Sequence, residues 1–184
     1  MEDWIYKHQF DMQNEHSAYW HSKSCHLMKS SKILWDAWNK NKILDGGDTY
    51  LMLMGLSLEL LLKSFYVEKG MKPPTHHSLD SLTSECFCTL TNKENIILKI
   101  LSGYITWQGR YPTPKDRINR STGENTGYES VREQLKPFEN TLGFTDQLAG
   151  KSNGSLRRSD IDFDNLLPIW QKINSEYVSR YIGT

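Results

Sequence analysis

The stretch that most constrains the fold is a long apolar run that ends at a glycine. Residues 49–69 read TYLMLMGLSLELLLKSFYVEK, and Gly70 follows. Apolar residues repeat at helical spacing, and glycine commonly ends a helix. The first stripe contains Leu51, Gly55, Leu58, Leu62 and Phe65, and the second contains Leu53, Leu56, Leu60 and Val67. Because only Ser57, Ser64 and Glu68 remain for a solvated side, the run predicts a central, mostly buried helix.

The rest of the sequence also predicts helices, because no stretch alternates as a half-buried strand would. The expected helices span about residues 14–38, 49–69, 93–108, 128–140 and 164–181, with a short one near 76–82. Pro73-Pro74 requires an extended connector, and Pro168 is expected in the first turn of the last helix. We therefore predict an all-α fold, an antiparallel four- to five-helix bundle.

Length and loop composition indicate one domain. A chain of 184 residues fits a single domain spanning residues 1–184. Pro, Gly, Ser, Thr and Asn recur at about residues 110–127, which we interpret as a long polar loop. Residues 151–159, KSNGSLRRS, form a second flexible, basic stretch in this interpretation.

Charge and cysteine content exclude several classes of protein. The 22 Lys and Arg balance the 22 Asp and Glu, which argues against a nucleic-acid coat protein but not against a local basic site. Three cysteines in poor spacing favour a reducing, cytoplasmic location over a disulfide framework.

The first residues lack a signal-peptide pattern. The apolar run Leu51–Leu62, interrupted by Glu59, is too short and too charged to span a membrane, so we expect no membrane association.

No metal or cofactor motif stands out. Cys86 and Cys88 are too closely spaced for a zinc pair. His21 and Cys25 share a helix face, with His26 adjacent, but two ligands are a weak signal. Phosphate-binding loops, nucleophile elbows and zinc-protease motifs are missing from the sequence. We expect neither a cofactor nor a metal.

The most informative charged residues lie inside the central apolar run. Glu59 and Lys63 are spaced i,i+4, so they can pair along a helix. They lie on the side opposite Ser57, near Met52 and Tyr66. Such pairs are commonly solvated, but charges on an apolar face are costly unless they are paired or used. We therefore treat Glu59 and Lys63 as a half-buried pair with a role in a site or an interface.

Two further segments carry candidate site residues. In THHSLDSL, Thr75 can cap the short helix, and His76 or His77 can project at its start to bind a partner group; an ordinary surface histidine is the alternative. In WQGRYPTPKDR, Arg110 can simply cap a helix end. Arginine also binds phosphate through two parallel hydrogen bonds, and tyrosine offers a stacking face. The anion site in that second interpretation contains Arg110, Tyr111, Lys115, Arg117 and Arg120.

Together these segments resemble the HEPN superfamily (higher eukaryotes and prokaryotes nucleotide-binding domains). The shared pattern is an apolar helix with a small residue, S/A-L-E-x-L-L-K, a Gly, a Pro and T-H-x-L-x-x-L, carried here by LMLMGLSLELLLKSFYVEKGMKPPTHHSLDSL. YITWQGRYPTP is similar to a segment of uncharacterised bacterial members. The resemblance covers about residues 15–112 and implies a four- to five-helix bundle that usually forms homodimers. The surplus of aromatic residues also predicts a homodimer.

The resemblance implies two classes of function. Many members are metal-independent ribonucleases in toxin–antitoxin, phage-defence or RNA-processing systems, and others bind nucleotides or substrates beside nucleotidyltransferases without catalysis. The ribonucleases carry Arg, four to six residues, then His. Counted from Arg110, that His falls at Lys115, Asp116 or Arg117, and no histidine follows His77. The ribonuclease signature is therefore absent.

Three functions remain open at this stage. The first is a non-catalytic HEPN-like domain that binds a nucleotide, RNA or partner protein, with an antitoxin or a nucleotidyltransferase as possible partner. The second is a divergent metal-independent ribonuclease that uses Arg110 with His76 or His77. The third is a structural or accessory interaction bundle. The ligand-binding residues expected in the first are Glu59, Lys63, His76, Arg110 and Tyr111.

Overall fold

The computed structural model describes residues 3–86, 88–112, 127–137 and 156–182, and within these ranges every regular element is a helix. In chain order they are α1 (Asp3–Glu15), α2 (Ser17–Asn39), α3 (Gly47–Glu68), α4 (Leu79–Glu85), α5 (Asn92–Gly103), the π-helical turn η1 (Tyr104–Gln108), α6 (Gly127–Leu135), the 3-10 turn η3 (Arg158–Ile161) and α8 (Phe163–Tyr181). The expected all-α helical bundle is confirmed.

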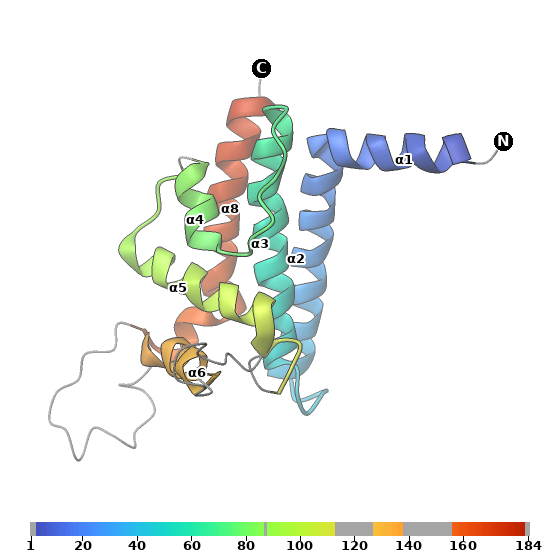
Figure 1. The fold of residues 1–184 in the computed structure, drawn as a ribbon. Coiled ribbons are helices and arrows are strands. Elements are labelled where there is room, and N and C mark those ends of the chain that lie inside the picture. The colour runs from blue at the N-terminus through green and yellow to red at the C-terminus, as the bar shows by residue number, and fades with distance from the viewer. Residues whose placement is uncertain (1–2, 87, 113–126, 138–155, 183–184) are drawn as a thin grey trace, which may run out of the picture.

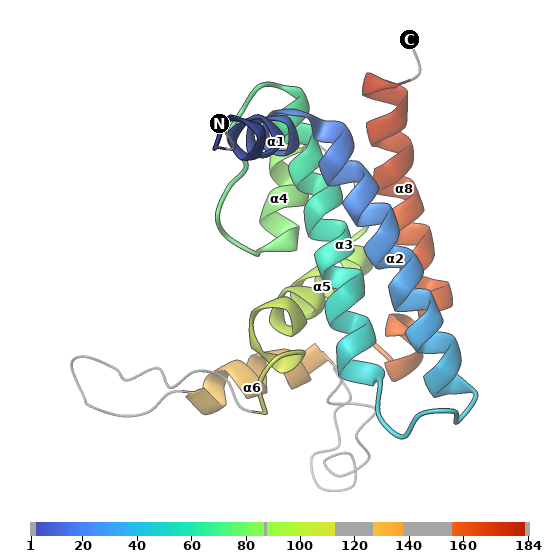
Figure 2. The same cartoon turned by 90° about the vertical axis from the view of Figure 1, so that its right-hand side faces the viewer.

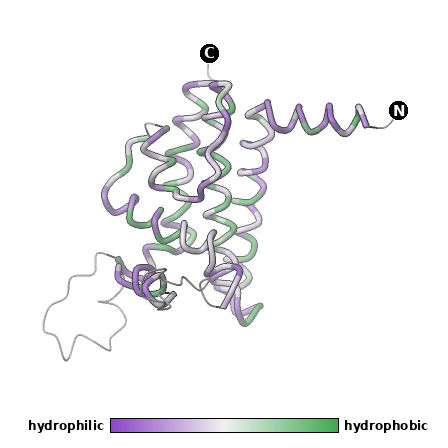
Figure 3. The backbone as a smooth tube through the Cα atoms, in the orientation of Figure 1, coloured by the Kyte–Doolittle hydropathy of each residue, from purple (hydrophilic) through white to green (hydrophobic). Residues whose placement is uncertain are grey.

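The long helices α2, α3 and α8 run along the molecule, and the shorter helices cover one side and one end (Figure 1). α3 is the central element, since it packs against α2, α4, α5, η1 and α8. Figure 2 shows α4 and α5 stacked along one face of α3, with α6 below them. α1 projects sideways from the opposite end of the bundle in Figure 1. The hydropathy colouring in Figure 3 shows apolar segments within the bundle and a mixed pattern on α1.

The prediction of a central, mostly buried α3 agrees with the structure. Met54, Leu58, Leu61, Leu62 and Phe65 are fully buried. α3 has 22 residues, so it extends beyond the apolar run Leu51–Leu62 that was judged too short to span a membrane, and by length and composition alone the whole helix could cross one. However, 78% of its apolar window is buried inside the fold, as in the core helix of a soluble protein. Burial, rather than length, identifies its role.

The predicted solvated side of α3 is wrong at two of its three positions. Glu68 is exposed, but Ser57 and Ser64 are fully buried. The reason is a repeat on α2, where three buried serines recur every seventh residue and face α3 in antiparallel register. We call the buried residues Ser17, Ser24, Ser31, Ser57 and Ser64 the serine seam.

Reciprocal hydrogen bonds join the two helices of the serine seam, α2 and α3. The Ser24 hydroxyl donates to the Ser57 carbonyl at 2.7 Å, and the Ser57 hydroxyl donates to the Ser24 carbonyl at 2.8 Å. The indole N–H of Trp170, on α8, donates to the Ser57 Oγ at 2.9 Å. Serine is small, and each of these two hydroxyls donates to a backbone carbonyl of the facing helix. α2 and α3 therefore approach closely here without leaving either hydroxyl unpaired.

Several expected boundaries differ from those observed. The helix predicted from about residue 14 is α2, which begins at Ser17; α1, which precedes it and meets it at His16, was not predicted. The short helix begins at Leu79 rather than near His76. Pro168 is the sixth residue of α8, not in its first turn; the helix continues through this exposed position, where water can reach the backbone. Most of the expected loop, residues 113–126, and residues 138–155 lie outside the described residues.

Glycines fix the elements that surround the candidate site. A Cβ on Gly103 would lie 1.9 Å from the Gln134 side chain, so α6 docks directly on the end of α5. There the Gln134 amide donates to the Ile100 carbonyl at 2.7 Å. A Cβ on Gly109 would lie 2.4 Å from the Cβ of Met52, so the end of η1 packs closely on α3. These contacts hold η1 between α3 and α6.

Candidate functional site

Glu59 and Lys63 form a buried ion pair on the side of α3 that faces away from the serine seam. The Lys63 ammonium donates to Glu59 Oε1 at 2.6 Å, and the two side chains are only 8% and 6% exposed. The pairing follows from their i,i+4 spacing, and the burial is deeper than the half-buried arrangement expected from sequence. Removing both charges from water has a large desolvation cost, so the pair depends on further partners.

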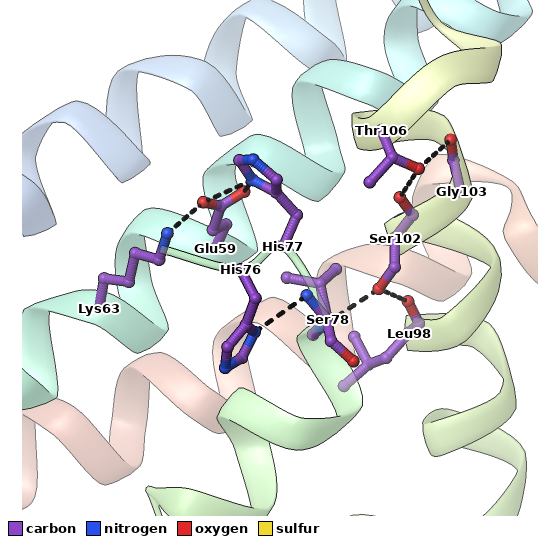
Figure 4. A network of polar contacts seen from close by, with 10 residues as sticks. Glu59, Lys63, His76, His77, Ser78, Leu98, Ser102, Gly103 and Thr106 are labelled. Carbon is purple, nitrogen blue, oxygen red and sulfur yellow. Dashed lines mark hydrogen bonds and ion pairs between the residues drawn. The ribbon is translucent and has the colours of Figure 1, made fainter. Parts of the chain in front are cut away.

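His77 supplies that further partner. Its Nδ1 lies 2.9 Å from Glu59 Oε2 and 3.0 Å from Oε1, and the imidazole is 42% exposed. Because a carboxylate only accepts hydrogen bonds, Nδ1 carries the donated proton, and Nε2 is left to face other groups. Figure 4 shows the resulting row from Lys63 through Glu59 to His77. We call these three residues the Glu59 cluster.

His76, which was also predicted as a ligand-binding residue, makes its polar contacts outside the Glu59 cluster. Its Nδ1 accepts a hydrogen bond from the Ser78 backbone N–H at 3.3 Å, and its Nε2 lies 3.7 Å from Glu85 Oε1. Figure 4 shows the two imidazoles on opposite sides of the connector. Adjacent residues in an extended connector point in opposite directions, so one of the two had to face away from α3. The position of α4 decides which one, because His77 directly precedes its N-cap, Ser78.

A cavity of about 990 Å³ opens beside His77. The connector before α4, together with α5, η1 and α6, forms its walls, and the walls carry both cations and acids. Its lining residues include His76, His77, Ser78, Asp80, Lys99, Ser102, Thr106, Trp107, Glu133 and Lys136. We call it the His77 cavity. Lys99, Trp107 and Lys136 were not among the predicted site residues, because they come from helices whose packing the sequence pattern does not reveal.

Hydrogen bonds hold the wall of the His77 cavity in place. The Ser102 hydroxyl accepts from the Leu79 backbone N–H at 2.9 Å and donates to the Leu98 carbonyl at 2.9 Å. This links the first residue of α4 to α5 (Figure 4). The end of the connector that carries His77 is therefore tied to α5 through Leu79, the first residue of α4, and to Glu59 through His77 itself.

Arg110 and Tyr111 lie elsewhere. Both are exposed just after η1 and line a second cavity of about 410 Å³, together with Asp48, Gln108 and Val131. Met52, which Gly109 contacts, precedes Glu59 by about 10 Å along α3. The five predicted site residues thus divide between two places, and Trp107 lines both cavities. Lys115, Arg117 and Arg120 of the predicted anion site lie outside the described residues.

Burial dominates the electrostatics around these cavities. It raises the pKa of Asp48 in the second cavity; the negative charge of Asp45 adds to this and Arg158 opposes it. Burial also raises the pKa of Tyr104 to about 12, and the Gln108 amide donates to its hydroxyl at 3.2 Å. The buried Gln108 Oε1 has no hydrogen-bond partner among the described groups.

The cysteines and possible metal ligands offer little chemistry. Burial raises the pKa of Cys86 to about 12 and that of Cys88 to about 11, so both stay protonated thiols rather than nucleophiles near neutral pH. Within the described ranges, no three His, Cys, Asp or Glu side chains gather in a way that would hold a metal ion. The group with the most evident chemistry is therefore the oriented imidazole of His77.

Comparisons with known proteins add no further assignment: neither the protein-family models nor the curated proteins nor the solved structures gave a match to this chain.

Proposed function

We propose that this chain is a HEPN-like domain that binds a nucleotide or a segment of RNA in the His77 cavity without cleaving it. The observation that carries the proposal is the Glu59 cluster, in which a buried ion pair holds a half-exposed imidazole at the edge of a cavity. Buried ion pairs are weak devices for stability, since apolar residues of similar size often serve as well. Such a pair at a cavity edge is better explained by the orientation it gives to His77.

The chemistry of the His77 cavity fits a ligand with both phosphate and a ring. Lys136 and Lys99, whose ammonium lies 3.8 Å from Asp80 Oδ2, bring positive charge. The Trp107 indole offers a flat face on which a base can stack. Ser102 and Thr106 add hydroxyl groups to the same wall. Arg110 and Tyr111, which adjoin Trp107 from the second cavity, extend the surface for a ligand longer than one nucleotide.

The setting of the proposed function follows from the resemblance and, for its location, from the cysteine usage. It is a cytoplasmic one, in a toxin–antitoxin or phage-defence system, with an antitoxin or a nucleotidyltransferase as partner. The missing Arg-x4-6-His signature favours binding over cleavage, because Lys115, Asp116 and Arg117 occupy the positions at which the histidine is expected.

Binding of labelled ligands tests the proposal directly. We would titrate the protein into a fluorescent adenine nucleotide and into a labelled single-stranded RNA, in EDTA, and follow anisotropy. His77→Gln and the double variant Lys99→Ala/Lys136→Ala should each weaken binding by about tenfold or more, since each removes a direct contact. Lys40→Ala, which changes an exposed lysine outside both cavities, is the matched control. Unchanged affinity in both cavity variants would rule out this cavity as the binding site.

One observation favours a second candidate, a divergent metal-independent ribonuclease. A carboxylate that orients an imidazole is the arrangement used for general acid–base chemistry, and Glu59 and His77 have that geometry. Incubation of the protein with RNA in EDTA distinguishes the two functions. Cleavage that is lost in His77→Gln and Arg110→Ala, but kept in His76→Gln, would establish the ribonuclease and overturn the binding-only proposal.

A further inference from the structure

Helix α1 has no packing that explains its apolar side chains. None of its 13 residues is buried, and Trp4, Ile5, Tyr6 and Phe10 are each at least half exposed. A helix of this length is marginal in water by itself, since tertiary packing provides most helical stability in proteins. Figures 1 and 2 show α1 extending away from the bundle rather than lying along it.

The exposed apolar side chains gather at the end of the molecule from which α1 projects. The Ser17 hydroxyl donates to a Glu68 carboxylate oxygen and accepts from the Tyr177 hydroxyl, so the start of α2 and the ends of α3 and α8 meet there. Among the described residues, only three exposed large apolar side chains lie away from this end: Ile33, Leu44 and Tyr111. The others are Trp4, Ile5, Tyr6, Phe10, Tyr19, Met71 and Ile182. Apolar patches of this kind are rare on monomers unless they bind something.

We propose that α1 docks on this same end of a second copy of the chain, around Tyr19, Met71 and Ile182, in a two-fold exchange of arms. The chain carries both an arm and a receiving surface, which is what a self-complementary, closed dimer requires. Because the arm and the surface lie at one end, two copies that meet end to end bury both arms at once. The proposal does not depend on the ligand of the His77 cavity.

Charge favours a second copy over a membrane as the occupant. α1 carries three carboxylates, Asp3, Asp11 and Glu15, against one lysine, Lys7. The receiving surface includes the exposed lysines Lys69 and Lys72 on either side of Met71, and the neighbouring carboxylate, Glu68, is bonded to Ser17. The two lysines are therefore complementary to the acidic arm. Helices that lie on anionic membranes are instead rich in Lys and Arg, which α1 is not.

The area available is adequate for a stable dimer. Trp4, Tyr6 and Phe10 are 64%, 67% and 66% exposed. Tyr6 and Phe10 lie about 40° apart around α1 and Trp4 about 120° from Phe10, so one receiving surface can cover the first two and part of the third. With an equal area on the receiving surfaces, this removes roughly 1,000–1,500 Å² from water, at the lower end of standard specific interfaces.

The mass of the full chain in solution is the first test. Light scattering coupled to size-exclusion chromatography, over a range up to tens of micromolar, should show a dimer. Phe10→Glu and Trp4→Glu should raise the dissociation constant by about 100-fold or more, because each places two charges in the interface. Ile33→Glu, at an equally exposed position on α2, is the matched control and should remain dimeric. A monomeric wild type, or a dimer disrupted by Ile33→Glu but not by Phe10→Glu, would overturn the proposal.

Folding does not confound this test. Since α1 contributes no buried residue, Phe10→Glu should keep the thermal unfolding midpoint that a monomeric bundle shows, and it should still bind ligand in the His77 cavity. A variant that is monomeric but still binds ligand would support this inference independently of the proposed function. A chain that forms the dimer but binds no ligand would contradict the proposed function and leave this inference standing.

Cross-linking tests the exchange itself. In a Cys25→Ser background, mild oxidation of a mixture of Tyr6→Cys and Met71→Cys chains should join the two kinds of chain, and neither variant alone should cross-link. A disulfide formed by Tyr6→Cys alone would mean that arms pair with arms, and absence of any cross-link in a dimer would place the interface elsewhere; either result overturns the exchange.

Co-sedimentation with anionic phospholipid vesicles should leave the chain in solution, whereas vesicle binding lost in Phe10→Glu would show α1 to be a membrane anchor instead.

Discussion

Helix α3 carries two buried polar groups on nearly opposite sides, and they differ in kind. Ser57 of the serine seam faces α2 and α8, and Glu59 of the Glu59 cluster lies about 160° around the helix, toward the connector before α4. The serine seam is neutral and made of short side chains. The Glu59 cluster is charged and made of long side chains that converge on one carboxylate.

One of these polar groups is entirely buried and the other reaches the surface of a cavity, and this indicates different roles. In the serine seam, the hydroxyls of Ser24 and Ser57 bond to backbone carbonyls and the Trp170 indole, and both side chains are fully buried. In the Glu59 cluster, the last member, His77, is 42% exposed and lines a cavity. A closed polar group contributes to close helix packing, whereas one that reaches a cavity is available to a ligand.

The largest effect is expected from breaking the ion pair. Lys63→Met leaves the Glu59 carboxylate buried with only the half-exposed His77 as partner, which should lower the free energy of unfolding by about 3–5 kcal/mol. Urea denaturation followed by circular dichroism measures this. The control is Glu59→Gln/Lys63→Met, which removes both charges and should recover most of the loss. If the double variant is as unstable as the single one, the uncompensated charge is not the cause.

The next largest effect is expected from filling the serine seam. Ser57→Leu forces extra methyl groups between α2 and α3 and removes one acceptor of the Trp170 indole, at a cost of about 2–4 kcal/mol. The thermal unfolding midpoint reports the change. Ser30→Leu, on the exposed side of α2, should change stability by less than about 0.5 kcal/mol. Equal effects of the two substitutions would mean that the serine seam does not set the packing distance.

The sequence was sufficient to predict the fold class because helical periodicity in α3, α5 and α8 is a local property. It also placed Glu59 and Lys63 together, since i,i+4 spacing implies proximity on any helix. It failed for Ser57 and Ser64, because polarity alone suggests solvent and only the matching serine repeat on α2 reveals the contact. That repeat is present in the sequence at Ser17, Ser24 and Ser31, but a seven-residue spacing of serines does not by itself show which helix it faces.

The candidate site was harder to predict than the fold. The choice between His76 and His77 depends on how the connector meets α3, which is a tertiary property. The separation of Arg110 from Glu59 depends on where η1 packs, and that contact is set by Gly109 against Met52. The exposed α1 was missed for a related reason, because its apolar residues do not form the single stripe of a helix that packs within its own chain.

Alkaline pH should weaken the serine seam through Tyr177, alongside its effect on other buried tyrosines such as Tyr104. Burial raises the pKa of Tyr177, whose hydroxyl donates to Ser17; the bond to Ser17 opposes this shift and Glu68 adds to it. Because the pKa is higher in the folded chain than in the unfolded one, this stability is complete below about pH 10 and is lost as pH rises through the folded value. The loss should approach about 1.4 kcal/mol per pH unit within that window. The free energy of unfolding, measured at several alkaline pH values together with tyrosinate absorbance, checks this. In Tyr177→Phe this free energy should fall less steeply with pH. An equally steep loss in Tyr177→Phe would assign the effect to other tyrosines.

The smallest effect on stability, and the most informative about function, is expected from His77→Gln. The imidazole is half exposed, and glutamine can still donate to Glu59, so the free energy of unfolding should change by less than about 1 kcal/mol. Ligand affinity should nevertheless fall about tenfold, because the ring that faces the cavity is gone. His26→Gln, at an exposed position on α2 outside both cavities, is the matched control and should leave both quantities unchanged. A serine-seam variant gives the opposite combination, with lower stability and unchanged affinity while the protein stays folded. If His77→Gln instead lowers stability as much as Lys63→Met and leaves affinity intact, the Glu59 cluster is a packing device like the serine seam, and the binding role assigned to it is wrong.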